Sequence, residues 1–164
     1  MKKLKIIVDN DLFIYEISIN VATIFYIEDN GYCFPDDKWN DFTNIILGEW
    51  TYKILQLYYC DNIKFKFYFI DGPFRLDIFK DNNMKLTIDC INYRGYREKC
   101  EHTITISYYD FIDALYDAYK AFSYILYSNG LHKGKYESVY NQSIKETKEL
   151  KNIRNRQFSI CEMV

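Results

Sequence analysis

Apolar and polar residues alternate along the first 28 residues of the chain, and this period of two predicts β-strands. A short strand is expected over Leu4–Val8 and a long strand over residues 13–27, with a turn at Asp9-Asn10-Asp11 between them. The apolar residues of the long strand should share one face of a sheet: Phe13, Tyr15, Ile17, Ile19, Val21, Phe25 and Ile27.

After Asn30-Gly31 the spacing of the apolar residues changes to steps of three and four, which predicts an amphipathic helix. Pro35 and the carboxylates of Asp36 and Asp37 are expected to start this helix, because negative charge stabilises the positive end of a helix dipole. The apolar stripe of the helix comprises Trp39, Phe42, Ile46, Trp50, Ile54 and Leu57.

The stretch FYFIDGPFRLDIF, from Phe67 to Phe79, predicts a hairpin. Gly72-Pro73 suits a type II′ turn, since glycine accepts a positive φ and proline fixes the next φ. We interpret Asp71-Gly72-Pro73 as a turn and not as a catalytic motif. This turn would pair Phe69 with Leu76. One face of the hairpin would then be apolar, with Phe65, Phe67, Phe69, Phe74, Leu76 and Ile78, and the other charged, with Lys64, Lys66, Arg75 and Asp77.

Two more strands, near residues 84–90 and 104–106, should extend this sheet. Ser107-x-x-Asp110 is a variant capping box that predicts the start of a helix, and Asn129-Gly130 predicts its end. A weaker helical pattern covers residues 135–154.

The predicted order of elements is therefore β-β-α-β-β-β-β-α-α. Short connections between consecutive strands require antiparallel pairing, so we expect one antiparallel sheet of about six strands. Alternation along the strands indicates that the helices pack on one face of this sheet. The expectation is an α+β fold in a single domain over residues 1–164, with residues 155–164 as a loose C-terminal tail.

Composition agrees with one soluble domain. The chain has 164 residues, of which 49% are hydrophobic and 27% charged, as in ordinary globular proteins. Its five cysteines are an odd number without a C-x-x-C pair and are expected to be reduced. Asp9 and Asp11 interrupt the apolar run after the initial lysines, which argues against a signal peptide, and no segment approaches the ~20 apolar residues that span a bilayer. These features predict a cytoplasmic protein that does not enter a membrane.

Charge is distributed unevenly along the chain. Residues 1–128 hold 14 Lys and Arg against 19 Asp and Glu, and residues 129–164 hold 7 against 4. The basic residues of the C-terminal part alternate with glutamates, which is typical of a solvated helix face held by i,i+4 pairs. A nucleic-acid partner is therefore not expected.

Catalytic chemistry has one candidate in this sequence. Cys100 and His102 would lie on the same side of a strand, with Cys90 as a neighbour, and a cysteine activated by a histidine could act as a nucleophile. No third residue that would orient the histidine is identifiable. The spacing does not predict a metal site, and no nucleotide or cofactor motif occurs, so no cofactor is expected. A small enzyme using His102 and a cysteine is the alternative hypothesis.

Acidic residues gather at predicted turns and at a predicted helix start. They could serve only to keep the protein soluble, or they could attract a basic protein partner. On the second interpretation the partner-binding residues are Asp9, Asp11, Glu28, Asp29, Asp36 and Asp37.

The strings FPDDKWNDF, ILGEW and FIDGPF occur in this order between residues 34 and 74. In combination, they resemble small uncharacterised bacterial proteins, some of which are associated with immunity to polymorphic toxins, and the similarity extends over about residues 34–126. The resemblance implies a stand-alone cytoplasmic protein that binds and neutralises a cognate toxin. It carries over no site residue, because the shared positions are framework residues.

Overall fold

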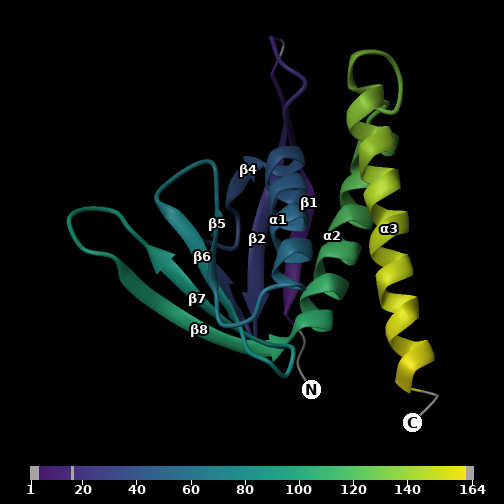
Figure 1. Cartoon of the computed structure of the whole chain (residues 1–164). Coiled ribbons are helices and arrows are strands. Elements are labelled where there is room, and N and C mark those ends of the chain that lie inside the picture. Colours follow the sequence, from purple (N-terminus) through teal and green to yellow (C-terminus); the bar gives the residue numbers. More distant parts are fainter. Residues whose placement is uncertain (1–3, 16, 162–164) are drawn as a thin grey trace.

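A computed structural model describes residues 4–15 and 17–161, the last six of these through their backbone alone. It confirms an α+β fold (Figure 1). The elements are β1 (Lys5–Ile14), β2 (Val21–Asp29), β3 (Tyr32–Phe34), β4 (Asn40–Phe42), α1 (Thr43–Leu57), β5 (Lys64–Tyr68), β6 (Phe74–Lys80), β7 (Lys85–Asn92), β8 (Lys99–Ser107), α2 (Tyr108–Ser128), the 3-10 helix η1 (Gly134–Tyr136) and α3 (Glu137–Cys161).

The strands form two antiparallel sheets of four strands, whereas the sequence predicted one sheet of about six. In the first, sheet A, β2 pairs with β1 along one edge and with β3 and β4 along the other. The second, sheet B, has the order β5-β6-β7-β8. The separation was missed because β3 and β4 are only three residues long, too short to give an alternating pattern.

Helix α1 packs where the two sheets meet. The indole of Trp50 lies edge-on to Phe25 of sheet A and to Phe69 beside sheet B, with ring centroids 5.3 Å apart in both pairs. Its Nε1–H donates to the carbonyl oxygen of Tyr68 (3.0 Å). Helix α2 also contributes to this core, through Phe111, while α3 lies against α2 on the side away from the sheets (Figure 1).

The predicted turn at Asp9-Asn10-Asp11 is wrong. β1 runs through these residues as one strand, and its register against β2 shifts between Asp9 and Phe13. An irregular strand can absorb extra residues as a bulge, so this acidic segment does not have to reverse the chain. The chain reverses after β1, where the backbone N–H of Ser18 donates to the carbonyl oxygen of Tyr15 (3.2 Å).

The position of this reversal changes the predicted core. Three members of the expected apolar face, Val21, Phe25 and Ile27, are buried. The other four are exposed at the end of β1 and in the β1–β2 connection: Phe13, Tyr15, Ile17 and Ile19.

Helix α1 begins at Thr43, several residues after the start predicted at Pro35 and Asp36. A turn closed by the N–H of Trp39 and the carbonyl oxygen of Asp36 (3.3 Å) comes first, and β4 follows it. Trp39 and Phe42 therefore lie before the helix. The rest of the predicted stripe is confirmed as its buried face: Ile46, Trp50, Ile54 and Leu57.

Helix α2 begins with the predicted capping box, since Ser107 and Asp110 exchange side-chain to backbone hydrogen bonds. The last helix, α3, continues past the predicted end at residue 154 to Cys161. Residues 162–164 of the predicted loose tail lie outside the described residues.

The β5–β6 hairpin has a wider loop than predicted. Phe67 pairs with Leu76, and the N–H of Phe69 donates to the carbonyl oxygen of Phe74 (3.0 Å), which leaves residues 70–73 as the loop. The register is therefore two residues away from the predicted one. Because side chains alternate with a period of two, this shift keeps every residue on its predicted face.

A buried carboxylate explains the wider loop. Asp41 of β4 is 1% exposed and accepts hydrogen bonds from the backbone N–H groups of Ile70 (3.0 Å) and Asp71 (3.1 Å). It also accepts from the N–H of Phe42 (2.7 Å) and from Nε1 of Trp39 (3.1 Å). One side chain of sheet A thus holds the hairpin loop of sheet B.

We expect Gly72→Ala to destabilise the protein by roughly 1 kcal/mol or more. Gly72 has a φ of +108°, and an added Cβ would lie 2.8 Å from the Trp39 ring. Asp71→Asn is the matched control and should unfold like the wild type, since only the backbone of Asp71 is held by Asp41. Urea unfolding of the two variants measures the difference. Equal midpoints for Gly72→Ala and the wild type would contradict this description of the loop.

Candidate functional site

The outer face of sheet A, which faces away from the helices, brings five of the six predicted acidic residues together. Strand register places Glu28 opposite Lys5 and Cys33, and Asp9 opposite Ile24, all with side chains on this face. Asp36 and Asp37, in the turn before β4, act on Cys33, and Asp11 of the β1 bulge lies beside Asn40, which pairs with Ile24 of this face. We name these five residues the acidic face: Asp9, Asp11, Glu28, Asp36 and Asp37.

Tyr26 lies at the centre of the acidic face, opposite Ile7 of β1. Burial raises the pKa of Tyr26, and the negative charges of Glu28, Asp37 and Asp9 raise it further. The pKa of the Cys33 thiol is raised in the same way, first by burial and then by the negative charges of Glu28, Asp37 and Asp36. Asp9, Glu28, Asp36 and Asp37 therefore lie close enough to these two side chains to act as one negatively charged surface.

Most of this charge is not neutralised within the protein. Glu28 pairs with Lys5 (2.9 Å). In the described part of the chain, no ion pair involves Asp9, Asp11, Asp36 or Asp37, and all four are exposed. A surface of this kind is free to pair with positive charge on another molecule.

Asp29 is the exception among the predicted partner-binding residues. It pairs with Tyr32 across the β2–β3 hairpin and points to the inner side of sheet A. There its Oδ2 lies 2.9 Å from Nε2 of His102, a residue of sheet B. Asp29 thus links the two sheets and does not belong to the acidic face.

His102 has the orienting carboxylate that sequence reasoning could not find. The side chain of Asp29 is 13% exposed, and the ring of Tyr32 lies against the imidazole with centroids 4.4 Å apart. Burial and the charge of Glu101 raise the pKa of Tyr32 to about 12, so this phenol stays neutral at physiological pH. No sequence signal joins residues 73 positions apart, which is why this pair was missed.

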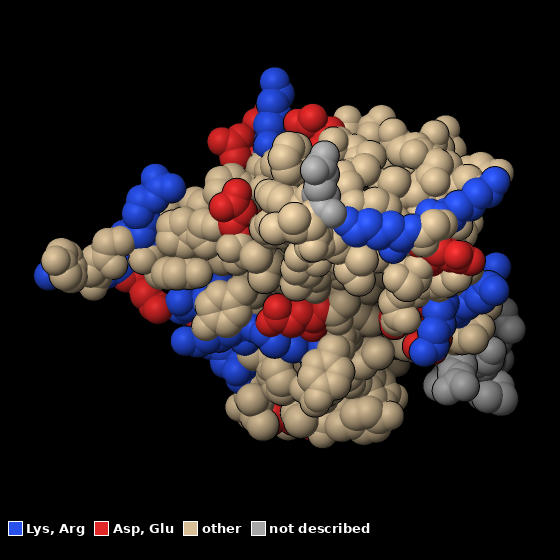
Figure 2. Space-filling model, turned by 90° about the horizontal axis from the view of Figure 1, so that it is seen from above, with Lys and Arg blue, Asp and Glu red and all other residues tan. Residues whose placement is uncertain are grey.

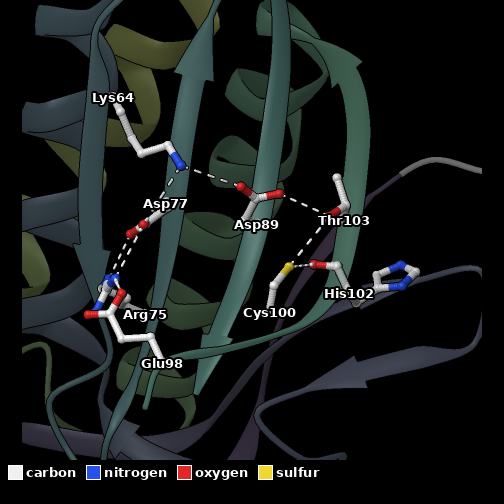
Figure 3. Close-up of polar contacts among 8 residues, drawn as sticks. All are labelled: Lys64, Arg75, Asp77, Asp89, Glu98, Cys100, His102 and Thr103. Atoms are coloured by element: carbon white, nitrogen blue, oxygen red, sulfur yellow. Dashed lines mark hydrogen bonds and ion pairs between the residues drawn. The ribbon is translucent and has the colours of Figure 1, made fainter. Parts of the chain in front are cut away.

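The predicted pairing of Cys100 with His102 is wrong. A bulge in β8 pairs His102 with Cys90 but Cys100 with Ile91, so the two side chains lie on opposite sides of the sheet. The Cys100 sulfur contacts the carbonyl oxygen of His102 (3.5 Å), while the imidazole points away from it (Figure 3). Cys90 shares the imidazole's side but is fully buried, and burial raises the pKa of its thiol strongly. Neither cysteine has the arrangement of an activated nucleophile.

The outer face of sheet B carries a chain of paired polar groups (Figure 3). Arg75, 3% exposed, donates through Nη1 and Nη2 to both carboxylate oxygens of Glu98 (2.8 and 2.7 Å) and through Nε to Asp77 (2.6 Å). Lys64 lies between Asp77 and Asp89, 3.9 and 3.5 Å from their oxygens. Opposite charges alternate along this chain, so Arg75 and Lys64 are paired with carboxylates on the same face and are not free to bind an anion.

Comparison of the chain with protein-family models, with curated proteins and with solved structures finds no match. Among the residues that the structure describes, no group of three or more His, Cys, Asp or Glu side chains is placed to hold a metal ion. No described helix combines the length and apolar character needed to cross a membrane.

Thiol labelling distinguishes the cysteines. Cys100 is exposed and should react with an alkylating reagent at about the rate of the unfolded protein, whereas buried Cys90 should react roughly a hundredfold or more slowly, because labelling requires the structure to open. Mass spectrometry of proteolytic peptides at successive times measures both rates. Fast labelling of Cys90 in the folded protein would contradict this assignment and would support a Cys90–His102 nucleophile.

Proposed function

We propose that this chain is a non-enzymatic protein-binding module that uses its acidic face to bind a basic surface of a cognate protein. The sharpest form of this proposal is an immunity-type protein that neutralises a bacterial toxin. The observation that carries it is the convergence of five acids on one face of sheet A, namely Asp9, Asp11, Glu28, Asp36 and Asp37. The four other than Glu28 form no ion pair with a described residue.

Apolar side chains within the acidic face also support binding to a protein. Ile7, Ile24 and Tyr26 are partly exposed at its centre, and Phe13 is 54% exposed at its end. Protein interfaces commonly combine an aromatic or aliphatic centre with a polar rim. Acids around such a centre would speed association with a basic partner and select against acidic ones.

Charge elsewhere on the molecule gives less support to a nucleic-acid partner. Seen from the end that carries the β1–β2 connection, most of the surface is uncharged, and acidic and basic groups are interleaved around it (Figure 2). A face that binds phosphate backbones is expected to carry clustered Lys and Arg.

A small enzyme is the second candidate, and the His102–Asp29 pair is the observation that favours it. A carboxylate that orients an imidazole is part of many general acid–base sites. We rank it second because neither Cys90 nor Cys100 is placed as a nucleophile for this imidazole.

Charge reversal tests the proposal. The variant Asp9→Lys/Asp36→Lys/Asp37→Lys should lose the partner that the tagged wild type captures from its native cells, because it turns the acidic face basic. The matched control, Asp117→Lys/Glu137→Lys/Glu149→Lys, changes the net charge equally on the exposed surfaces of α2 and α3 and should keep the partner. Capture followed by mass spectrometry identifies the protein, and circular dichroism verifies that both variants fold.

Two results would contradict the proposal. One is a partner retained by the acidic-face variant, and the other is a partner lost equally from both variants. For the immunity-type form, the captured protein should be a toxin with a basic surface, and the product of the gene immediately upstream is the first to examine.

A further inference from the structure

The bulge in β1 creates a hollow at the end of the acidic face. Asp9 pairs with Ile24 and Phe13 with Ala22, so residues 10–12 have only one residue of β2 opposite them. The extra residues are held in place by Asn40, whose Nδ2 donates to the carbonyl oxygen of Asp11 (3.1 Å). The resulting hollow has a volume of about 280 Å³ and is lined by Asp11, Leu12, Phe13, Tyr15 and Asn40.

This lining combines a free carboxylate with aromatic rings. The Asp11 side chain is exposed and has no hydrogen bond or ion pair with the described residues. Phe13 and Tyr15 are 54% and 37% exposed, and their rings meet edge to face with centroids 4.8 Å apart. The ring of Phe42 packs against that of Tyr15, with centroids 5.1 Å apart. The rings are therefore held in a fixed arrangement although they face solvent.

We infer that this hollow receives an arginine side chain of the protein partner. The inference rests on the proposed function and names the group that the partner would insert. A guanidinium can stack its flat face on an aromatic ring and donate two parallel hydrogen bonds to one carboxylate. Asp11 and the rings of Phe13 and Tyr15 offer both kinds of contact within one concavity.

Surrounding charge favours a cation over other ligands. Asp9 precedes the bulge on the same strand, and among the described residues Asp11 is the only charged side chain that lines the hollow. Lys135 does not line the hollow; its Nζ lies 3.4 Å from the backbone carbonyl oxygen of Tyr15.

The test uses N-acetyl-arginine amide as the probe and N-acetyl-citrulline amide as its neutral isostere. We expect the arginine probe to shift the amide resonances of residues 10–15 in ¹H–¹⁵N spectra at millimolar concentrations, and the citrulline probe to shift them far less. Asp11→Asn and Phe13→Ser should each weaken arginine binding about two- to fivefold, the scale of one exposed ion pair or cation–π contact. Asp117→Asn removes an exposed acid of α2, outside the acidic face, and should leave the affinity unchanged.

Equal binding of the two probes would overturn the inference, as would an affinity that Asp11→Asn leaves unchanged. So would shifts spread evenly over all acidic residues, since that pattern reports general attraction and not a site. The proposed function is tested separately by charge reversal: partner capture that depends on Asp9, Asp36 and Asp37 without arginine binding in the hollow refutes only the inference.

Discussion

The fold depends on one carboxylate that is buried without a cation. Asp41 accepts four hydrogen bonds, from three backbone N–H groups and one indole, and these donors come from both sheets. Burial raises the pKa of Asp41, and the hydrogen bonds counter this rise. All four groups donate and none accepts, an arrangement that stabilises the ionised form. An ionised Asp41 therefore holds the segment before α1 against the β5–β6 loop. This contact keeps the two sheets in place on either side of Trp50.

This junction also shapes the surface that we assign to binding. The turn that carries Asp36 and Asp37 ends at Trp39, whose indole is held by Asp41 and packs on Phe74. The part of the acidic face that carries Asp36 and Asp37 is thus a turn fixed from inside the protein, and a fixed surface loses less entropy on binding. On the outer face of sheet B, by contrast, the buried Arg75 forms ion pairs with Asp77 and Glu98. The two outer faces therefore differ in their pairing: Arg75 and Lys64 are paired on sheet B, whereas four acids of the acidic face form no ion pair with a described residue.

The sequence predicted those features that local rules determine. The faces of β5 and β6, the positive φ of Gly72, the capping box of α2 and the buried stripe of α1 each follow from period, turn chemistry or capping, and the structure confirms them. Features that depend on contacts between distant residues were missed, namely the Asp41 junction, the His102–Asp29 pair and the division into two sheets. The acidic residues were proposed to bind a partner because they lie in predicted turns. Their convergence on one face of sheet A, however, depends on strand register. Phe13 and Tyr15 were placed on one apolar face with Val21, Phe25 and Ile27, because periodicity cannot tell an exposed strand end from a buried one.

The most direct test of this account is the unfolding free energy of Asp41→Asn at neutral pH. An amide of the same size keeps one acceptor oxygen but turns its NH₂ group toward N–H donors, so at least one buried donor loses its acceptor. The account predicts a loss of about 1–3 kcal/mol in urea unfolding, with the largest amide shifts and faster hydrogen exchange at Ile70 and Asp71. Wild-type stability with unchanged amides at Ile70 and Asp71 would show that the ionised carboxylate does not hold the sheets together.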